Sequence, residues 1–158
     1  MITLLQYIPN VGSLVELNDL NYPLHQFDIE TTIDPREFKK MSESGEWPTF
    51  TYPGAMTVHA EGDIVGYGGT PTNDYVTKRI ALLDAVLPPI GVLTARHHGT
   101  LRLRLDGMSE NADALVVCSQ QSIPMKALHP AISEFSITWK AFLPYFTGVS
   151  SQTKYQLG

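Results

Sequence analysis

The side chains best suited to catalysis are carboxylates in two short pairs. Asp28 and Glu30 stand two residues apart, and so do Glu61 and Asp63. Residues i and i+2 share a face of a strand, so each pair could supply the acid and base of a glycosidase. Solvated strand faces carry the same pattern, and the sequence gives no distance between the pairs. We predict no enzyme and no catalytic residue, although a small hydrolase that uses Glu61 or Asp63 stays open if a cleft exists.

Histidines and glycines could hold a metal or a phosphate. The five histidines are His25, His59, His97, His98 and His129. His59 and Glu61 share a strand face, but two ligands do not make a zinc site and spacing places no third. The glycine-rich run GYGGT at 66–70 lacks both the Gly-Lys-Ser/Thr ending of a P-loop and the GxGxxG spacing of a dinucleotide fold. We predict a tight turn there, no metal and no cofactor.

Cysteine content and charge exclude several further classes. Cys118 is the sole cysteine, so no disulfide forms within the chain, and its apolar surroundings in the sequence predict a buried small hydrophobe. No apolar run reaches 18 residues and the first ten residues lack a signal-peptide pattern, which predicts folding in a reducing cytoplasm and no membrane partner. The net charge of −5 and the lack of a dense Lys/Arg cluster disfavour sequence-specific nucleic-acid binding.

The acidic residues are unevenly distributed. Residues 1–63 contain ten acids against Arg36, Lys39 and Lys40, whereas residues 64–158 contain six acids and eight bases. A solvated acidic face accounts for this distribution. A surface that must not bind DNA passing close to it accounts for it as well.

Alternating apolar residues mark the strands that must position these side chains. The clearest lies in 134–146, EFSITWKAFLPYF, where apolar residues alternate with a mostly polar set until Pro144; the apolar set is Phe135, Ile137, Trp139, Ala141 and Leu143. Further strands are expected at 1–8, 13–17, 24–33, 55–64, 92–95, 100–106 and 114–118, with 13–17 and 24–33 on either side of an Asn-Asp turn. The run 114–118 is apolar on both faces, which is typical of a central strand.

One helix is expected, at about residues 73–87. Thr72 or Asn73 could cap it, and Val76, Ile80, Leu83 and Leu87 recur at three- and four-residue steps as a buried stripe. Tyr75, Leu82 and Val86 widen that stripe. About seven strands and one packed helix predict a β-rich α+β fold, a sandwich or open barrel in a single domain over 1–158.

Residues 34–53 show no periodicity, contain three prolines, and are predicted to be a long inserted loop. Large aromatic residues on long loops often anchor against another surface, so Trp47, Phe50 and Tyr52 are candidate subunit-interface residues. The alternative is that they fold back onto their own sheet.

The second half resembles the distal tail proteins of siphovirus-type phages in the order of its elements. GDIVGYGG is followed by the helix TKRIALLDAVLPP, then by HGTLRLRLDG, ALVVCSQQ and the closing ITWKAFLPYFTG. The opening LVELNDLNYPLHQFDI also looks like the first hairpin of that family. Leu143 stands where an Asp is common in the family, and 34–53 does not align with it.

The resemblance implies a structural protein of the virion, assembled in the host cytoplasm. It would form a hexameric ring between the tail tube protein and the tail tip, hub or baseplate proteins, with an open lumen for DNA. Glu16, Asp28, Glu30 and Glu61 are then candidate lumen acids. Another tail ring, such as a tube or terminator protein, stays open. So does a monomeric carbohydrate-binding β-sandwich, in which Trp47 and Tyr52 would stack on sugars.

Overall fold

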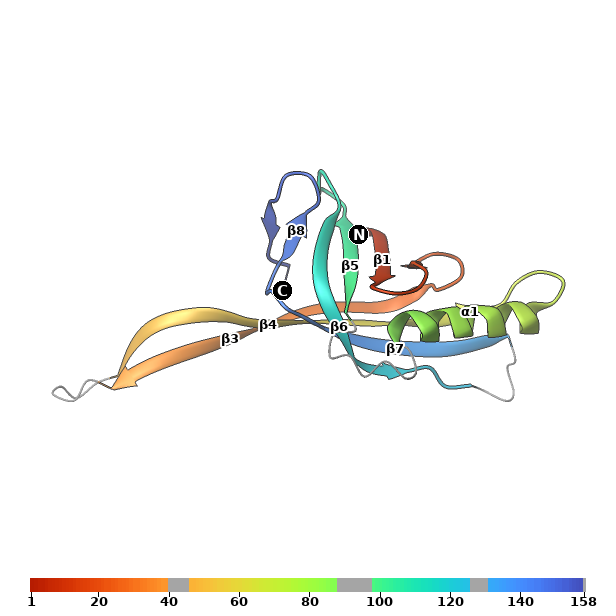
Figure 1. The fold of residues 1–158 in the computed structure, drawn as a ribbon, viewed down its shortest axis with the longest axis horizontal. Coiled ribbons are helices and arrows are strands. Elements are labelled where there is room, and N and C mark those ends of the chain that lie inside the picture. Colours follow the sequence, from red (N-terminus) through yellow and green to blue (C-terminus); the bar gives the residue numbers. More distant parts are fainter. Residues whose placement is uncertain (40–45, 88–97, 126–130, 158) are drawn as a thin grey trace.

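The computed structural model describes residues 1–39, 46–87, 98–125 and 131–157, and the side chains of these residues outside 33–53. The described strands form one antiparallel sheet that curls into a half-barrel, with one helix against it (Figure 1). The predicted β-rich α+β fold is confirmed. The strand predicted at 92–95 lies outside the described residues.

Nine strands of the described chain belong to this sheet. Seven of them follow one another across it in the order β2-β1-β5-β6-β7-β4-β3, while β8 pairs with β6, and β9 with β8. Their bounds are β1 Ile2–Pro9, β2 Val15–Leu17, β3 Leu24–Lys39, β4 Glu46–Val65, β5 Gly99–Leu105, β6 Ala112–Ser122, β7 Ile132–Ala141, β8 Phe146–Gly148 and β9 Lys154–Tyr155.

Strand β7 lies near the middle of the sheet and confirms the predicted alternation. Phe135, Ile137, Trp139 and Ala141 are buried, whereas Lys140 on the opposite face is exposed. The strand ends at Ala141, earlier than Pro144, and Leu143 is half exposed rather than inward. The pairing of β7 with β6 ends before residues 142–145. The chain then forms β8, which pairs with the beginning of β6.

The two ends of the sheet are joined by a short connection. β2 and β3 are consecutive in the chain, yet β2 pairs with β1 and β3 pairs with β4, so the predicted hairpin between them is wrong. The predicted Asn-Asp turn is nevertheless confirmed. Asp19 accepts hydrogen bonds from the backbone N–H groups of Asn21 and Tyr22, both at 2.8 Å. The backbone N–H of Asp63 on β4 donates to Pro23 O at 2.9 Å. The connection therefore bridges the open seam of the half-barrel.

Helix α1, Pro71–Val86, packs on β1, β2 and β4 and so covers this seam. Two tyrosine hydroxyls tie it down: Tyr22 donates to Lys78 O at 2.9 Å, and Tyr75 donates to the buried Ser133 Oγ at 2.8 Å. The helix starts two residues before the predicted start. Thr70 is the N-cap without a side-chain cap bond, so capping by Thr72 or Asn73 is incorrect.

The helix buries a different face from the one predicted. Tyr75, Leu82, Ala85 and Val86 are buried, and Leu83 is partly buried against the core. Val76, Ile80 and Leu87, expected inside, are exposed. The sequence offers two apolar sectors, and the bond from Tyr75 to Ser133 accompanies burial of the second one.

The segment predicted as a loop at 34–53 is largely strand. The backbones of 34–39 and 46–53 extend β3 and β4, with Asp34 opposite Tyr52 and Phe38 opposite Trp47. The last pair between β4 and β7 is Met56 with Ala141, so this hairpin projects beyond the sheet (Figure 1). We call its described part, residues 34–39 and 46–53, the arm.

Candidate assembly surfaces

Three of the four candidate lumen acids lie on neighbouring positions of two paired strands. Asp28 and Glu30 on β3 are exposed and stand opposite His59 and Thr57, whereas Glu61 on β4 is half-buried beside them. Glu16 is exposed on β2 opposite Gln6, at the other end of the strand order. The structure thus groups Asp28, Glu30 and Glu61 but does not group Glu16 with them in the sheet.

Histidines are interleaved with these acids on the outer face of the sheet. His59 Nε2 lies 2.9 Å from Glu61 Oε1, and its Nδ1 lies 2.9 Å from Thr138 Oγ1 on β7. His25 Nε2 lies 2.6 Å from Asp63 Oδ2. Glu61 and Asp63 are therefore paired with imidazoles.

A cleft of about 240 Å³ opens on the same face, lined in part by His25, Glu61 and Glu134. The described residues contain no group of three or more His, Cys, Asp or Glu placed to hold a metal ion. His97 and His129 lie outside the described residues. His59 with Glu61 gives two potential ligands, and the described residues place no third ligand beside them.

Two potential nucleophiles, Ser133 and Cys118, are withdrawn from solvent in whole or in part. Ser133 is buried and accepts the Tyr75 hydroxyl bond. Cys118 is half-buried, and desolvation raises the pKa of its thiol, so the thiol stays protonated at neutral pH. The predicted burial of Cys118 is thus only partly right.

Gly66 in the GYGGT run packs against the helix, since a Cβ there would lie 2.0 Å from Pro71 O.

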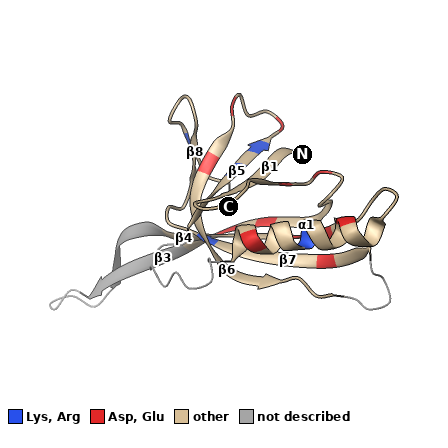
Figure 2. Cartoon of the chain, turned by 45° about the vertical axis from the view of Figure 1, so that its right-hand side comes forward, with Lys and Arg blue, Asp and Glu red and all other residues tan. Residues whose placement is uncertain are grey.

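Basic residues are dispersed over the described part of the chain (Figure 2), and two of them are paired with acids. Arg102 binds Asp113 through two bonds of 2.8 Å, and Lys78 pairs with Asp74 at 2.6 Å. No helix among the described residues is long and apolar enough to cross a membrane.

The candidate interface residues Trp47, Phe50 and Tyr52 lie on the β4 side of the arm. Their backbones pair with Phe38, Arg36 and Asp34 of β3. Their side chains lie outside the described residues. The arm projects from the end of the molecule opposite α1, so these positions are carried away from the half-barrel (Figure 1).

Two apolar surfaces are exposed that the sequence analysis did not predict to be exposed. The first, which we call the helix stripe, consists of Val76 and Ile80 on α1 and of Leu87 at its C-cap, whereas Leu83 between them is partly buried. The second, which we call the hinge patch, consists of Leu115 on β6 with Phe142 and Leu143 after β7. Their exposed fractions are 38% for Val76, 50% for Ile80, 39% for Leu87, 46% for Leu115, 60% for Phe142 and 50% for Leu143.

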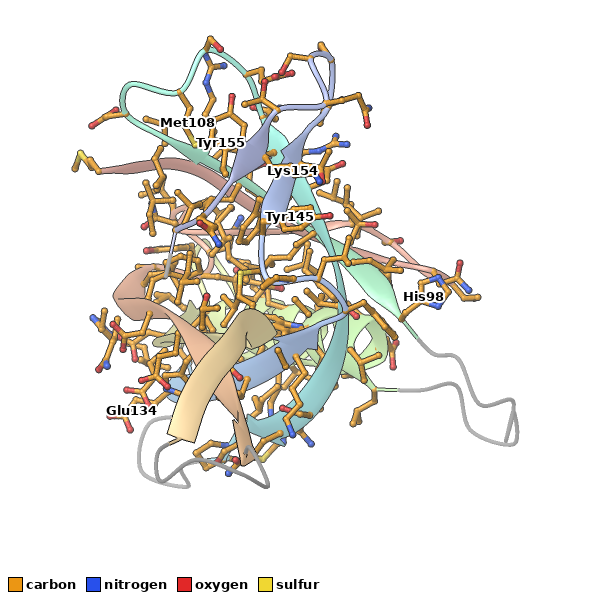
Figure 3. All side chains as sticks on the ribbon, turned by 90° about the vertical axis from the view of Figure 1, so that its left-hand side faces the viewer. His98, Met108, Glu134, Tyr145, Lys154 and Tyr155 are labelled. Atoms are coloured by element: carbon orange, nitrogen blue, oxygen red, sulfur yellow. The ribbon has the colours of Figure 1, made fainter. Side chains whose placement is uncertain are left out.

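A signal for both surfaces was present in the sequence. Phe142 falls in the polar phase of the closing strand, and Leu115 makes 114–118 apolar on both faces. The run 114–118 does lie in the central strand, β6, as predicted, but Leu115 on its second face is exposed. The helix stripe was predicted to be core, and it is exposed. Beyond the hinge patch, Lys154 Nζ lies 4.9 Å from the centroid of the Tyr145 ring, where β8 and β9 meet (Figure 3).

Comparison with known proteins shows similarity in fold. No protein-family model matches the chain, and no curated protein matches it in sequence. Among solved structures it is similar to the SPP1 Dit (gp 19.1) protein, described as a paradigm of the hub adsorption apparatus in phages that infect Gram-positive bacteria. The TM-score is 0.56 with 8% sequence identity, over 91% of this chain and 52% of that one. The chain thus shares a fold with about half of the SPP1 Dit protein.

Proposed function

We propose that this chain is a structural protein of a phage tail, a distal tail ring of six copies with an open lumen. Its neighbours would be the tail tube protein on one side and the tail tip, hub or baseplate proteins on the other. The observation that carries this is the fold likeness to SPP1 Dit, which extends over 91% of the chain. The order of elements in the sequence supports the same conclusion independently of that likeness.

The arm supplies the contact expected of a ring subunit. A hairpin that projects beyond the last pair of β4 with β7, Met56 with Ala141, exposes backbone edges with which a neighbouring copy would pair. Trp47, Phe50 and Tyr52 on this hairpin would then pack on an adjacent subunit, since large aromatic residues dominate binding at interfaces. A head-to-tail contact of this kind closes into a ring when the rotation between subunits permits.

The acidic outer face of β3 and β4 would line the lumen. Asp28 and Glu30 are exposed there, and a negative wall repels the DNA backbone as it passes. Replacing the four acids Glu16, Asp28, Glu30 and Glu61 by their amides should slow DNA ejection from purified particles. Ejection at an unchanged rate would remove the lumen role from these residues.

Location in the particle tests the proposal itself. Particles carrying an affinity tag after Leu157, which is partly buried near the chain end, would be labelled with gold and viewed by electron microscopy. Gold at the distal end of the tail is the expected result. Gold along the whole tail would indicate a tube protein, and gold at the head end would indicate a terminator.

A further inference from the structure

Arg104 on β5 is an exposed arginine without an acidic partner among the described residues. Arg102, two residues earlier on the same face of the strand, is bound by Asp113 of β6 through two bonds of 2.8 Å. The hydrogen bond from the Thr3 hydroxyl, at 3.0 Å, goes to the backbone carbonyl of Arg104 and not to its guanidinium. Within the described chain, the sheet therefore supplies a carboxylate to one arginine of this face and none to the other.

The register of β5 and β6 explains this difference. Arg102 stands opposite Asp113, and Leu103 stands opposite Ala112. The next residues along the two strands are Arg104 and Asn111, and both line one hollow of about 440 Å³. An amide side chain carries no charge, but its NH₂ group can donate a hydrogen bond. The Asp113 carboxylate beside Arg102 thus has an uncharged donor as its counterpart beside Arg104.

The hollow lies at the turn between β5 and β6, and part of its lining is apolar. Leu4 of β1 stands opposite Arg104 and is half-buried, while Leu105 and Met108 are packed against the core. The backbone N–H of Leu105 donates to Met108 Sδ at 3.3 Å, which holds this side chain at the turn (Figure 3). The other lining residues are Thr3, Asp106, Gly107 and Asn111.

The charges around the hollow favour an anion. Asp106 is the one acid in the lining, and its Oδ2 lies 3.4 Å from the terminal nitrogen of Met1. The ammonium group therefore offsets the charge of this carboxylate. Arg104 is left as the charge of the lining that no described residue balances.

We propose that this hollow binds a carboxylate carried on an apolar body, as in an acidic residue or the C-terminus of a peptide. The Arg104 guanidinium would donate two parallel hydrogen bonds to the carboxylate, in the geometry that the neighbouring arginine already shows with its own acid. The Asn111 amide would donate a third bond. The apolar body would lie on Leu4, Leu105 and Met108. This inference goes beyond the proposed function and does not depend on it, since one chain supplies the whole site.

The probe is N-acetyl-leucine, which joins one carboxylate to one apolar side chain. Titration into the full-length protein, followed by ligand-observed NMR, should give a dissociation constant of about 1–10 mM. N-acetyl-leucinamide keeps the apolar body without the charge, and acetate keeps the charge without the body. Each should bind at least about fivefold more weakly. Inorganic phosphate, an oxyanion with no apolar body, should also bind more weakly than the probe.

Three variants test the site from the side of the protein. Arg104→Gln removes the guanidinium and should weaken binding at least about fivefold. Asn111→Asp places a carboxylate of the chain itself opposite Arg104, which repeats the pairing of Arg102 with Asp113 and should abolish binding. Lys140→Gln removes an exposed cation of β7 outside the hollow and is the matched control, which should bind like the wild type. Because these side chains are exposed or half-buried, all three variants should keep the melting temperature of the wild type to within a few degrees.

Several outcomes would overturn the site. These are a wild type that does not bind the probe, acetate or phosphate that binds as well as the probe, or unchanged binding in Arg104→Gln or Asn111→Asp. An equal loss in Lys140→Gln would reduce the binding to general charge attraction and would overturn it too. Absence of binding would leave the proposed function standing, whereas a confirmed site in a chain found away from the tail would reject the proposed function alone.

Discussion

Strands β3 and β4 run through two regions, the half-barrel and the arm, and the two regions differ in what their sequences reveal. In the half-barrel, β4 lies between β3 and β7 and buries Met56, Val58, Ala60 and Ile64. In the arm the same two strands pair with each other alone in the described backbone. Alternation in a sequence records burial of one face of a strand, so it predicts the half-barrel and not the arm.

The half-barrel and the arm should also differ in what they contribute to stability and to recognition. The half-barrel contains the core of the described chain, which includes every large buried side chain from Leu5 to Phe146. The arm adds a strand pair at the end of the molecule. We therefore expect substitutions in the half-barrel to change the free energy of unfolding, and changes in the arm to affect assembly.

Removing the largest core side chain should have the largest effect. Trp139→Ala deletes a fully buried indole that packs at 5.7 Å, centroid to centroid, from the Tyr7 ring. The cavity should lower the free energy of unfolding by about 3–5 kcal/mol in urea denaturation. Lys140→Ala, one residue along the strand but exposed, is the control and should change it by less than about 0.5 kcal/mol. Equal effects would mean that β7 has no buried face.

Alkaline pH should destabilise the half-barrel through Tyr7 and Tyr22. Desolvation raises the pKa of each from 10.0 to about 12, and Cys118 adds to the shift of Tyr7 while Asp19 and Asp74 add to that of Tyr22. The stability they contribute is present in full below pH 10 and is lost as the pH rises to about 12. Ionisation of each tyrosine should lower the free energy of unfolding by roughly 2–3 kcal/mol.

Thermal unfolding between pH 9 and pH 12 measures this loss. Tyr7→Phe is a favourable control, because the buried Tyr7 hydroxyl has no hydrogen-bond partner among the described residues. Its stability at neutral pH should be close to that of the wild type. If the double variant Tyr7→Phe with Tyr22→Phe lost stability with pH as steeply as the wild type, the loss would belong to other groups.

A smaller effect is expected at the seam. Asp19→Ala removes the acceptor of the backbone bonds from Asn21 and Tyr22, in the connection that joins the two ends of the sheet. The free energy of unfolding should fall by about 1–2 kcal/mol in chemical denaturation. Asp19→Asn keeps one acceptor oxygen and should recover part of it. If Asp19→Ala were neutral, these bonds would not hold the seam.

The smallest effect on stability should come from replacing the arm. Residues 34–53 are exchanged for Asn-Gly, a two-residue turn that suits an antiparallel hairpin. The monomer should keep its stability to within about 1 kcal/mol, since the pairing of β4 with β7 begins at Met56. Assembly should be lost at the same time in ultracentrifugation. Unfolding of the shortened chain would erase the distinction between the two regions.

Local patterns predicted the elements of the fold well. The inward face of β7, the position of the single described helix and the β-rich class all followed from periodicity. Pairing partners did not follow from it. The turn at Asp19 suggested a hairpin, and only the curl of the sheet explains why β2 and β3 lie at its two ends.

The candidate surfaces were predictable only in part. The register groups Asp28, Glu30 and Glu61, but no spacing could show that Glu16 belongs to a distant strand. The helix stripe was visible as a stripe, yet a sequence does not say which of two apolar sectors faces the core. Phe142 stood out of phase in a strand that otherwise alternates, and that irregularity was the accessible sign of the hinge patch.

Electron microscopy of the purified protein, alone and in the particle it comes from, tests the central claim most directly. We predict rings of six copies with an open centre, and the same ring at the distal end of the tail. Solitary monomers that bind glycans, in particles with no such ring, would contradict the proposed assembly role.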